Sequence, residues 1–189
     1  METGIPNNSV RAICEDKDHN IWLGTAAGLC YITPSKKIVT PNGLSELGQE
    51  KILVSKLYCD TAGRIWISTA LENELFVYSN RKLEQFKGIT KIKNPSVNEV
   101  RQDKTGAFWF GVAPHYAVRI KDSEETVYNL KHDHQDGTVI NSILQDSNGD
   151  YWFAGDSGLT ILHNGNYTYY DKRNGIADDY INEVFPWYL

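Results

Sequence analysis

The sequence has little methionine or cysteine and no long hydrophobic run, and these shortages exclude some classes of protein. It holds one Met and three Cys in 189 residues. Its longest apolar stretches, such as 140–144, are short and broken by polar residues, whereas a membrane-spanning helix needs about 20 apolar residues. After Met1 there is neither a basic start nor an apolar stretch. We therefore expect no membrane span, and any export signal to have been removed or to lie outside this segment.

Positive charge is also scarce. The chain has 19 Lys and Arg against 24 Asp and Glu, a net charge of -5, and no basic run. This balance argues against nucleic acid or an anionic membrane as the main partner. Aromatic residues, by contrast, make up 12% of the chain. A high aromatic content favours a β-rich protein over a helical bundle.

Four segments of the chain repeat one pattern, in which an Asp is followed by a turn and then by a Trp. The segments are 16–25, 60–69, 103–112 and 146–155. The tryptophans fall at 22, 66, 109 and 152, so they are spaced by 44, 43 and 43 residues. A regular period of this length is typical of a repeat protein.

Each repeat predicts four short strands. Apolar residues three apart precede each Asp, as in Val10 and Ile13, and a fifth copy starts with Ile181 and Val184. Two further apolar stretches follow each Trp, at 28–32 and 37–39, 74–78 and 83–86, 116–120 and 125–128, and 158–162 and 167–170. Four strands in about 43 residues is the arithmetic of a β-propeller blade. Tetratricopeptide and ankyrin repeats have periods of about 33 or 34 residues, and the sequence shows no sustained 3.6-residue periodicity.

The predicted fold is therefore all-β, a single β-propeller segment over 1–189 made of four-stranded antiparallel meanders. The expected blades are 5–44, 45–88, 89–132 and 133–175, with a partial fifth blade at 176–189. Both termini begin a repeat, so they duplicate the same strand and do not complete one another. We expect a partial propeller, whose end blades are exposed or pair with a second copy of the chain.

The repeated residues have clear structural roles. We expect each Asp to accept hydrogen bonds from turn amides and each Trp to pack between adjacent sheets. These residues are Asp16, Asp60, Asp103, Asp146, Trp22, Trp66, Trp109 and Trp152. Replacing Trp66 or Trp109 by Ala should cost about 3 to 5 kcal/mol. The loss of Trp22 or Trp152, nearer the ends, should be milder.

The cysteines leave two readings open. Cys14, Cys30 and Cys59 form no Cys-x-x-Cys motif, and an odd number cannot all pair. Cys14 and Cys59 occupy matching places in two repeats and could be neighbours. We expect buried free thiols, because Cys behaves as a small apolar residue.

The pattern Val-x-x-Ile, Asp-x-x-Gly-x-Ile-Trp-Ile-Gly-Thr, then Gly-Leu, resembles the two-component regulator propeller repeat in the sensor regions of Bacteroides-type hybrid histidine kinases. The copies depart from it at His19, Ser68 and Ala154 and at the Gly-Leu positions 73–74 and 115–116. The resemblance implies an extracytoplasmic, periplasmic propeller that senses a ligand, often a glycan. The parent protein would be membrane-anchored and would signal to a histidine kinase.

Metal and enzyme chemistry find little support. The turns at 16–20 and 146–150 resemble the start of a calcium loop but have Ala27 and Ser157 where that loop needs Glu. The two imidazoles of 132–134 stand alone in a connecting loop. The sequence contains no motif for the carboxylate pair of a glycosidase and none for the Ser-His pair of a serine hydrolase. We expect no cofactor, no metal and no catalytic residue.

Blade topology predicts one ligand face. The turn between the second and third strands of a blade and the link to the next blade emerge on the same side. Sugars need an aromatic plane and planar polar groups. The candidate residues there are Tyr116, His115, Asn73, Asp156, Glu72 and His134. We interpret the chain as a non-catalytic sensor segment binding an oligosaccharide. The alternatives are an interaction propeller that mediates oligomerisation without a small ligand and, third, a propeller lyase.

Overall fold

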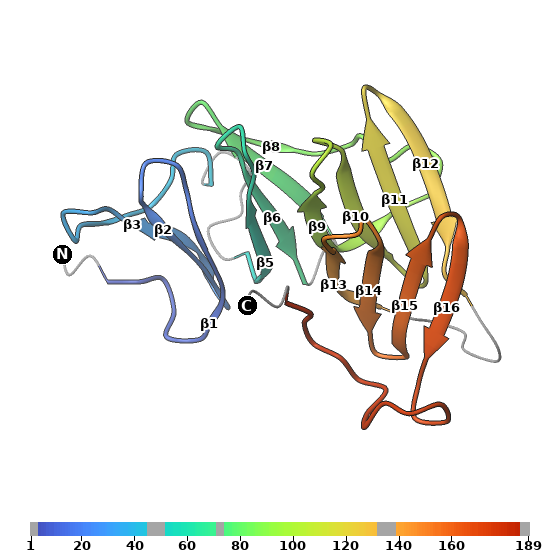
Figure 1. The fold of residues 1–189 in the computed structure, drawn as a ribbon. Helices are drawn as coiled ribbons and strands as arrows, with labels where there is room; N and C mark the ends of the chain where they lie inside the picture. The colour runs from blue at the N-terminus through green and yellow to red at the C-terminus, as the bar shows by residue number, and fades with distance from the viewer. Residues whose placement is uncertain (1–3, 45–51, 71–73, 132–138, 186–189) are drawn as a thin grey trace. The chain divides into compact units, whose positions relative to one another are not determined.

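The computed structural model describes residues 4–44, 52–70, 74–131 and 139–185. All regular secondary structure in these ranges is β, and sixteen strands form four separate four-stranded antiparallel sheets (Figure 1). The chain divides into two compact units, Met1–Gly88 and Ile89–Leu189. We call them unit 1 and unit 2. The prediction of an all-β chain built from propeller blades is confirmed.

Unit 1 contains blades 1 and 2, whose strands pair in chain order. Blade 1 consists of β1 (Val10–Glu15), β2 (Ile21–Thr25), β3 (Gly28–Ile32) and β4 (Ile38–Val39). Blade 2 consists of β5 (Val54–Cys59), β6 (Ile65–Thr69), β7 (Leu75–Ser79) and β8 (Lys82–Gln85). Their hydrophobic core includes Leu29, Ile67 and Phe76, each at most 2% exposed.

Unit 2 contains blades 3 and 4, built in the same way. Blade 3 consists of β9 (Ser96–Gln102), β10 (Phe108–Ala113), β11 (Tyr116–Lys121) and β12 (Glu124–Asn129). Blade 4 consists of β13 (Ile140–Gln145), β14 (Tyr151–Gly155), β15 (Gly158–His163) and β16 (Asn166–Tyr170). Their core includes Ala117, Ile140 and Phe153.

The first hairpin of each blade turns through a left-handed residue. Gly63, Gly106 and Gly149 have φ between 81° and 93°, and His19 takes the same place in blade 1 with φ 60°. Glycine adopts this region without a side-chain clash, whereas other residues do so at a cost. The departure of His19 from the repeat pattern therefore leaves the turn geometry unchanged.

Blades pack most closely where the repeat has Gly two residues after Trp. A Cβ on Gly24 would lie 2.4 Å from Val54 Cγ1, and one on Gly111 would lie 2.9 Å from Ile140 Cβ. In both pairs the second residue belongs to the first strand of the following blade. The missing side chain thus sets the distance between neighbouring blades.

The tryptophans of blades 1 and 3 pack against the next blade of the same unit. The ring centroids of Trp22 and Tyr78 lie 5.1 Å apart, and those of Trp109 and Tyr151 lie 4.2 Å apart. Trp22 is only 3% exposed. The expectation of a milder loss assumed an incomplete neighbouring blade, whereas Trp22 packs against blade 2, all four strands of which are present. Trp152, in blade 4, is half-buried.

A disulfide joins the two blades of unit 1. Cys14 in β1 and Cys59 in β5 are bonded, with their Cα atoms 6.1 Å apart, and Cys30 is free and buried. The expectation of free thiols is wrong for the bonded pair. Matching positions on neighbouring inner strands bring the Cα atoms within the range of a disulfide. Burial raises the pKa of the Cys30 thiol.

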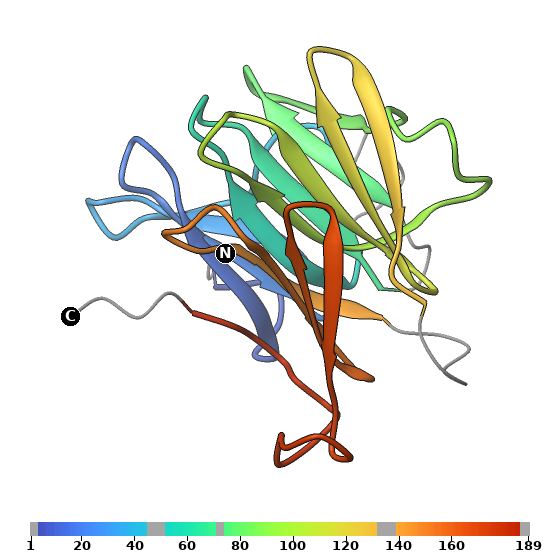
Figure 2. The same cartoon turned by 45° about the vertical axis from the view of Figure 1, so that its right-hand side comes forward.

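The start of the fifth repeat lies along blade 4 (Figure 2). Ile181 N donates to Gly155 O at 2.8 Å, and Val184 N donates to Ser142 Oγ at 3.3 Å. Within 171–185 these contacts do not extend into a regular strand, so the expected fifth inner strand is not formed. Every other inner strand pairs with the second strand of its own blade, and the described residues contain no such partner here.

Candidate functional site

The Asp and Trp of each repeat form one hydrogen-bonded turn. In blade 3, Asp103 Oδ1 accepts the backbone N–H groups of Thr105 and Ala107, and Oδ2 accepts Trp109 Nε1 at 3.0 Å. The corresponding Trp Nε1 to Asp Oδ2 distances are 2.7 Å, 2.9 Å and 3.1 Å in blades 1, 2 and 4. These carboxylates are occupied by the turn and the indole, so they stabilise the blade.

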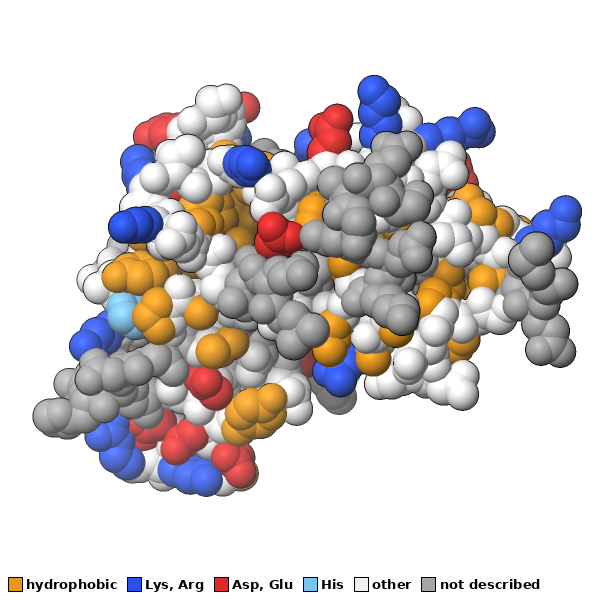
Figure 3. Space-filling model, turned by 180° about the vertical axis from the view of Figure 1, so that it is seen from behind, with side chains coloured by type: hydrophobic (Ala, Val, Ile, Leu, Met, Phe, Trp, Pro, Cys, Tyr) orange, Lys and Arg blue, Asp and Glu red, His pale blue; other side chains and the backbone are white. Residues whose placement is uncertain are grey.

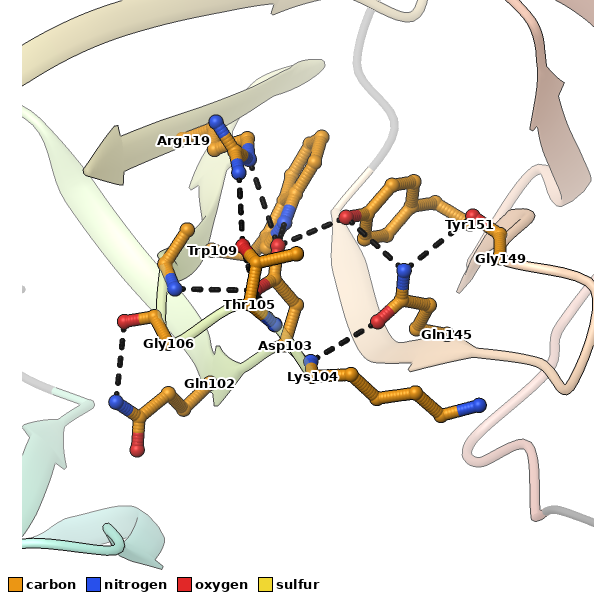
Figure 4. Close-up of polar contacts among 11 residues, drawn as sticks. Gln102, Asp103, Lys104, Thr105, Gly106, Trp109, Arg119, Gln145, Gly149 and Tyr151 are labelled. Carbon is orange, nitrogen blue, oxygen red and sulfur yellow. Dashed lines mark hydrogen bonds and ion pairs between the residues drawn. The ribbon is translucent and has the colours of Figure 1, made fainter.

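Unit 2 extends this turn into a polar network that joins its two blades (Figure 4). Asp103 Oδ2 also accepts Tyr151 Oη at 2.8 Å and lies 3.4 Å from Arg119 Nε. Burial alone would raise the pKa of Asp103, but the hydrogen bonds from Thr105, Tyr151, Trp109 and Ala107 outweigh it and lower the pKa to about 2. The carboxylate is therefore an ionised structural group at neutral pH.

His115 and Tyr116 meet at the turn between β10 and β11. Their ring centroids lie 4.5 Å apart, and both side chains are half-buried. Leu130 N donates to His115 O at 2.9 Å, so the turn lies beside the start of the link to blade 4. His115 Nδ1 is buried and has no hydrogen-bond partner among the described residues. This turn therefore offers an aromatic pair and an unused polar atom.

Asp156 occupies the matching turn of blade 4, between β14 and β15. Its Oδ1 accepts Val139 N at 2.9 Å and contacts Ser157 Oγ at 3.3 Å. This oxygen already closes the turn. Among the described residues, no hydrogen bond or ion pair links Asp156 to His115 or Tyr116. The other candidates, Asn73, Glu72 and His134, lie outside the described residues.

The inner strand of blade 3 carries a buried ion pair that the sequence pattern did not mark. Glu99 is 1% exposed, and its Oε1 lies 2.9 Å from Arg101 Nε. Arg101 Nη2 lies 3.9 Å from Glu183 in the segment after β16. The carboxylates of Glu99 and Glu183 thus flank one guanidinium, an arrangement that suits a structural ion pair and not a metal site. No group of three metal-ligating side chains occurs in the described ranges.

Unit 1 contains a cavity of about 550 Å³ beside the β1–β2 and β5–β6 turns. Its lining includes Trp22, Tyr31 and Tyr78 together with Lys17 and Arg81. The repeat pattern did not indicate this cavity. The available signal was Tyr31, which pairs with Trp22 in the ladder where the third repeat has Arg opposite Trp.

Charge is mixed on the surface that Figure 3 draws. Acidic and basic side chains are interspersed there, and hydrophobic side chains form small separate groups. This face therefore presents no field of a single sign. Within the described part of the chain, no helix has the length and apolarity to cross a bilayer.

A family model described as the two-component regulator propeller matches residues 4–27 and 134–157, each spanning the start of a repeat and its Asp-Trp turn. Both matched segments are similar to the two-component regulator propeller repeat. No curated protein matches the sequence significantly.

Solved structures agree with this fold. The chain resembles two extracellular domains from B. thetaiotaomicron, described as the hybrid two-component systems BT4673 and BT3049. The first is 23% identical with a TM-score of 0.75 over 95% of this chain and 25% of that one. The second is 22% identical with a TM-score of 0.76 over 98% and 25%. The chain thus spans about a quarter of their length.

A lyase shares the architecture more distantly. Virginiamycin B lyase from Staphylococcus aureus is 15% identical, with a TM-score of 0.64 over 86% of this chain and 55% of the lyase. At these identities each likeness is one of fold. Function therefore has to be argued from the residues of this chain.

Proposed function

We propose that the chain is a ligand-sensing segment of an extracytoplasmic, membrane-anchored two-component receptor and that it binds an oligosaccharide and signals to a histidine kinase. The observation that carries the proposal is the regulator-propeller match in two repeats, joined to fold similarity with extracellular domains of hybrid two-component systems. The disulfide between blades 1 and 2 supports a periplasmic location, because disulfides persist in oxidising compartments.

The oligosaccharide would bind at the β10–β11 turn. Tyr116 offers an aromatic plane for the C–H face of a sugar, and the ring of His115 lies 4.5 Å from it, centroid to centroid. Asp156 would add an acceptor from blade 4. An open turn of this kind favours micromolar or weaker affinity.

Calorimetric titration of the 189-residue chain with a panel of host and plant glycans tests this site. We expect one glycan class to bind, and Tyr116→Ala to weaken that binding by about tenfold, equivalent to one lost stacking contact. Tyr169→Ala, on the outer strand of blade 4, removes an aromatic ring elsewhere and should change nothing. Silence across the panel, or equal losses in both variants, would contradict the assignment.

A second candidate, an interaction propeller, rests on the exposed face of β1. Val10 and Ile13 are 38% and 63% exposed, whereas the matching Val54 and Leu57 of β5 are 0% and 7% exposed. In blade 2, the matching face of β5 is covered by blade 1, which precedes it in the chain. We propose that a preceding blade of a parent propeller, or a second copy of the chain, covers Ile13.

Light scattering over a range of concentrations distinguishes these partners. Association of the isolated chain that Ile13→Lys abolishes supports a second copy. A monomer at all concentrations leaves a preceding blade as the partner. Protection of Ile13 from solvent within the monomer, read from side-chain NMR, would contradict both.

A further inference from the structure

We propose that the cavity between blades 1 and 2 is a second binding site, for a saccharide that carries a carboxylate. We call it the unit 1 cavity and define it by Trp22, Tyr31, Tyr78, Lys17 and Arg81. This site goes beyond the proposed function. It lies beside the turns between the first and second strands of blades 1 and 2, whereas the proposed glycan site lies at a turn between the second and third strands. Its volume of about 550 Å³ falls within the range of small-molecule sites.

An aromatic wall forms one side of the unit 1 cavity. The ring centroid of Trp22 lies 4.8 Å from that of Tyr31 and 5.1 Å from that of Tyr78. Trp22 is buried, while the two tyrosines are half-buried and so remain partly open to solvent. Such a surface matches the apolar C–H face of a sugar ring. Burial, and next the neighbouring Tyr31, raise the pKa of Tyr78, so its phenol stays protonated and can donate a hydrogen bond.

The cationic residues Lys17 and Arg81 also line the cavity. Among the described residues, neither Lys17 nor Arg81 forms an ion pair with a carboxylate. The carboxylate of Asp16 is occupied by Trp22 Nε1 and by the Asn20 amide, which leaves Asp18 as the remaining acidic residue of the lining. The two free cations outnumber it. The cavity therefore favours an anionic ligand, and Lys and Arg recognise carboxylates through charge-assisted hydrogen bonds.

Unit 2 provides an internal comparison, because the same gap between its blades is bridged by side chains (Figure 4). Arg119 stands where unit 1 has Tyr31, and its Nη2 donates to Thr105 Oγ1 at 3.1 Å. Tyr151 stands where unit 1 has Ile65, and its Oη donates to Asp103 Oδ2 at 2.8 Å. These side chains occupy the space that unit 1 leaves open.

The lysines of the two units show the same contrast. Lys104, the counterpart of Lys17, donates from Nζ to Asp146 O at 2.8 Å, and Gln145 accepts its backbone N–H at 3.0 Å. The stem of Lys17 instead lies along Gly63, where an added Cβ would come within 2.8 Å of Lys17 Cδ and Cε. Its ammonium group stays available to a ligand at the cavity opening.

The disulfide holds the cavity walls in place. Cys14 is paired with Trp22 in the β1–β2 ladder, and Cys59 is paired with Ile65 in the β5–β6 ladder. The bond therefore links the residues directly behind both walls. A site whose walls are fixed before binding loses less entropy when the ligand enters.

The direct test is calorimetric titration of the 189-residue chain with digalacturonate and with its neutral counterpart, galabiose. We expect digalacturonate to bind about tenfold more tightly, because it can use the cations. The pair Lys17→Gln and Arg81→Asn should abolish this preference; Asn suits the backbone of Arg81, whose φ is 62°. Lys104→Gln is the matched control and should leave both affinities unchanged.

A second variant keeps the test independent of lost charge. The pair Tyr31→Arg and Ile65→Tyr transfers the unit 2 bridge into unit 1 and adds a cation. It should fold, since unit 2 carries the same contacts, and it should lose digalacturonate binding because the cavity is filled. NMR of the Trp22 indole N–H reports occupancy in the wild type.

Three results would overturn the proposal. They are the absence of digalacturonate binding at millimolar concentration, a preference for galabiose, and binding that survives the Tyr31→Arg and Ile65→Tyr pair. Tyr116→Ala leaves the unit 1 cavity intact, so binding that persists in that variant separates this site from the β10–β11 turn.

Discussion

Replacing Asp103 by Asn should destabilise unit 2 through a mechanism that depends on pH. The Asp103 side chain is 1% exposed, and its Oδ2 receives donors from Trp109, Tyr151 and Arg119. An Asn amide offers one acceptor, for the turn, and places an N–H group against these donors. A buried donor without an acceptor costs about 1 to 3 kcal/mol.

The pKa of Asp103 gives a second route to the magnitude. The pKa falls from its ordinary value of 3.8 to about 2 on folding. At 1.36 kcal/mol per unit, ionised Asp103 contributes about 2 kcal/mol of stability. Because the folded pKa is the lower one, this contribution is complete well above pH 4 and is lost as the pH falls towards 2. The two routes agree, so we expect a loss of about 2 to 3 kcal/mol at pH 7.

Urea denaturation at pH 7 and at pH 2.5, together with hydrogen exchange of the Trp109 indole N–H, measures this effect. The difference in unfolding free energy between wild type and Asp103→Asn should shrink to about 1 kcal/mol at the lower pH. Asp122→Asn changes a carboxylate in the exposed β11–β12 turn and should cost less than about 0.5 kcal/mol. A loss below that value for Asp103→Asn at pH 7, or a loss independent of pH, would refute the reasoning.

Three further changes have defined outcomes. Gly24→Ala should cost about 1 to 3 kcal/mol, because its Cβ meets the next blade, while Gly4→Ala, with open space around it, should be neutral in thermal melts. Trp109→Ala should cost about 3 to 5 kcal/mol and Trp152→Ala less, since Trp152 is only half-buried; similar losses would contradict the account of blade packing. Replacing both cysteines of the disulfide by Ser opens a loop of sequence separation 45 and should cost about 4 kcal/mol. Without reductant, unfolded wild type should be alkylated at Cys30 alone; three alkylated thiols would exclude the bond.

The Asp-Trp turn could be deduced from the sequence because its contacts are local. Each Asp bonds groups two, four and six residues further along the chain, as Asp60 does with Ala62, Arg64 and Trp66. Interactions over so short a separation depend little on the rest of the fold. Their recurrence at a fixed period was enough to predict four-stranded blades.

Which atoms of the candidate ligand residues are free to bind depends partly on contacts with segments outside the repeated Asp-Trp turn. Asp156 suits a sugar by residue type, but its Oδ1 is occupied by Val139 N from the link that precedes blade 4. The contact of His115 with Tyr116 is local, whereas the place of their turn beside Leu130 is not. Residue type and topology predicted the face, and only the tertiary contacts decided which atoms remain available.

The sequence by itself determined the number of repeats, the strands and the residues of each turn. Only the tertiary structure decided how neighbouring blades differ: Cys14 bonds Cys59, Gly24 lies against Val54, and Ile13 lacks the cover that Leu57 has. The first two outcomes are contacts between residues of neighbouring repeats, and the third shows that one pattern position can be exposed in one blade and buried in the next. A repeat pattern records what the blades share, whereas a cavity between two blades arises from what they do not share.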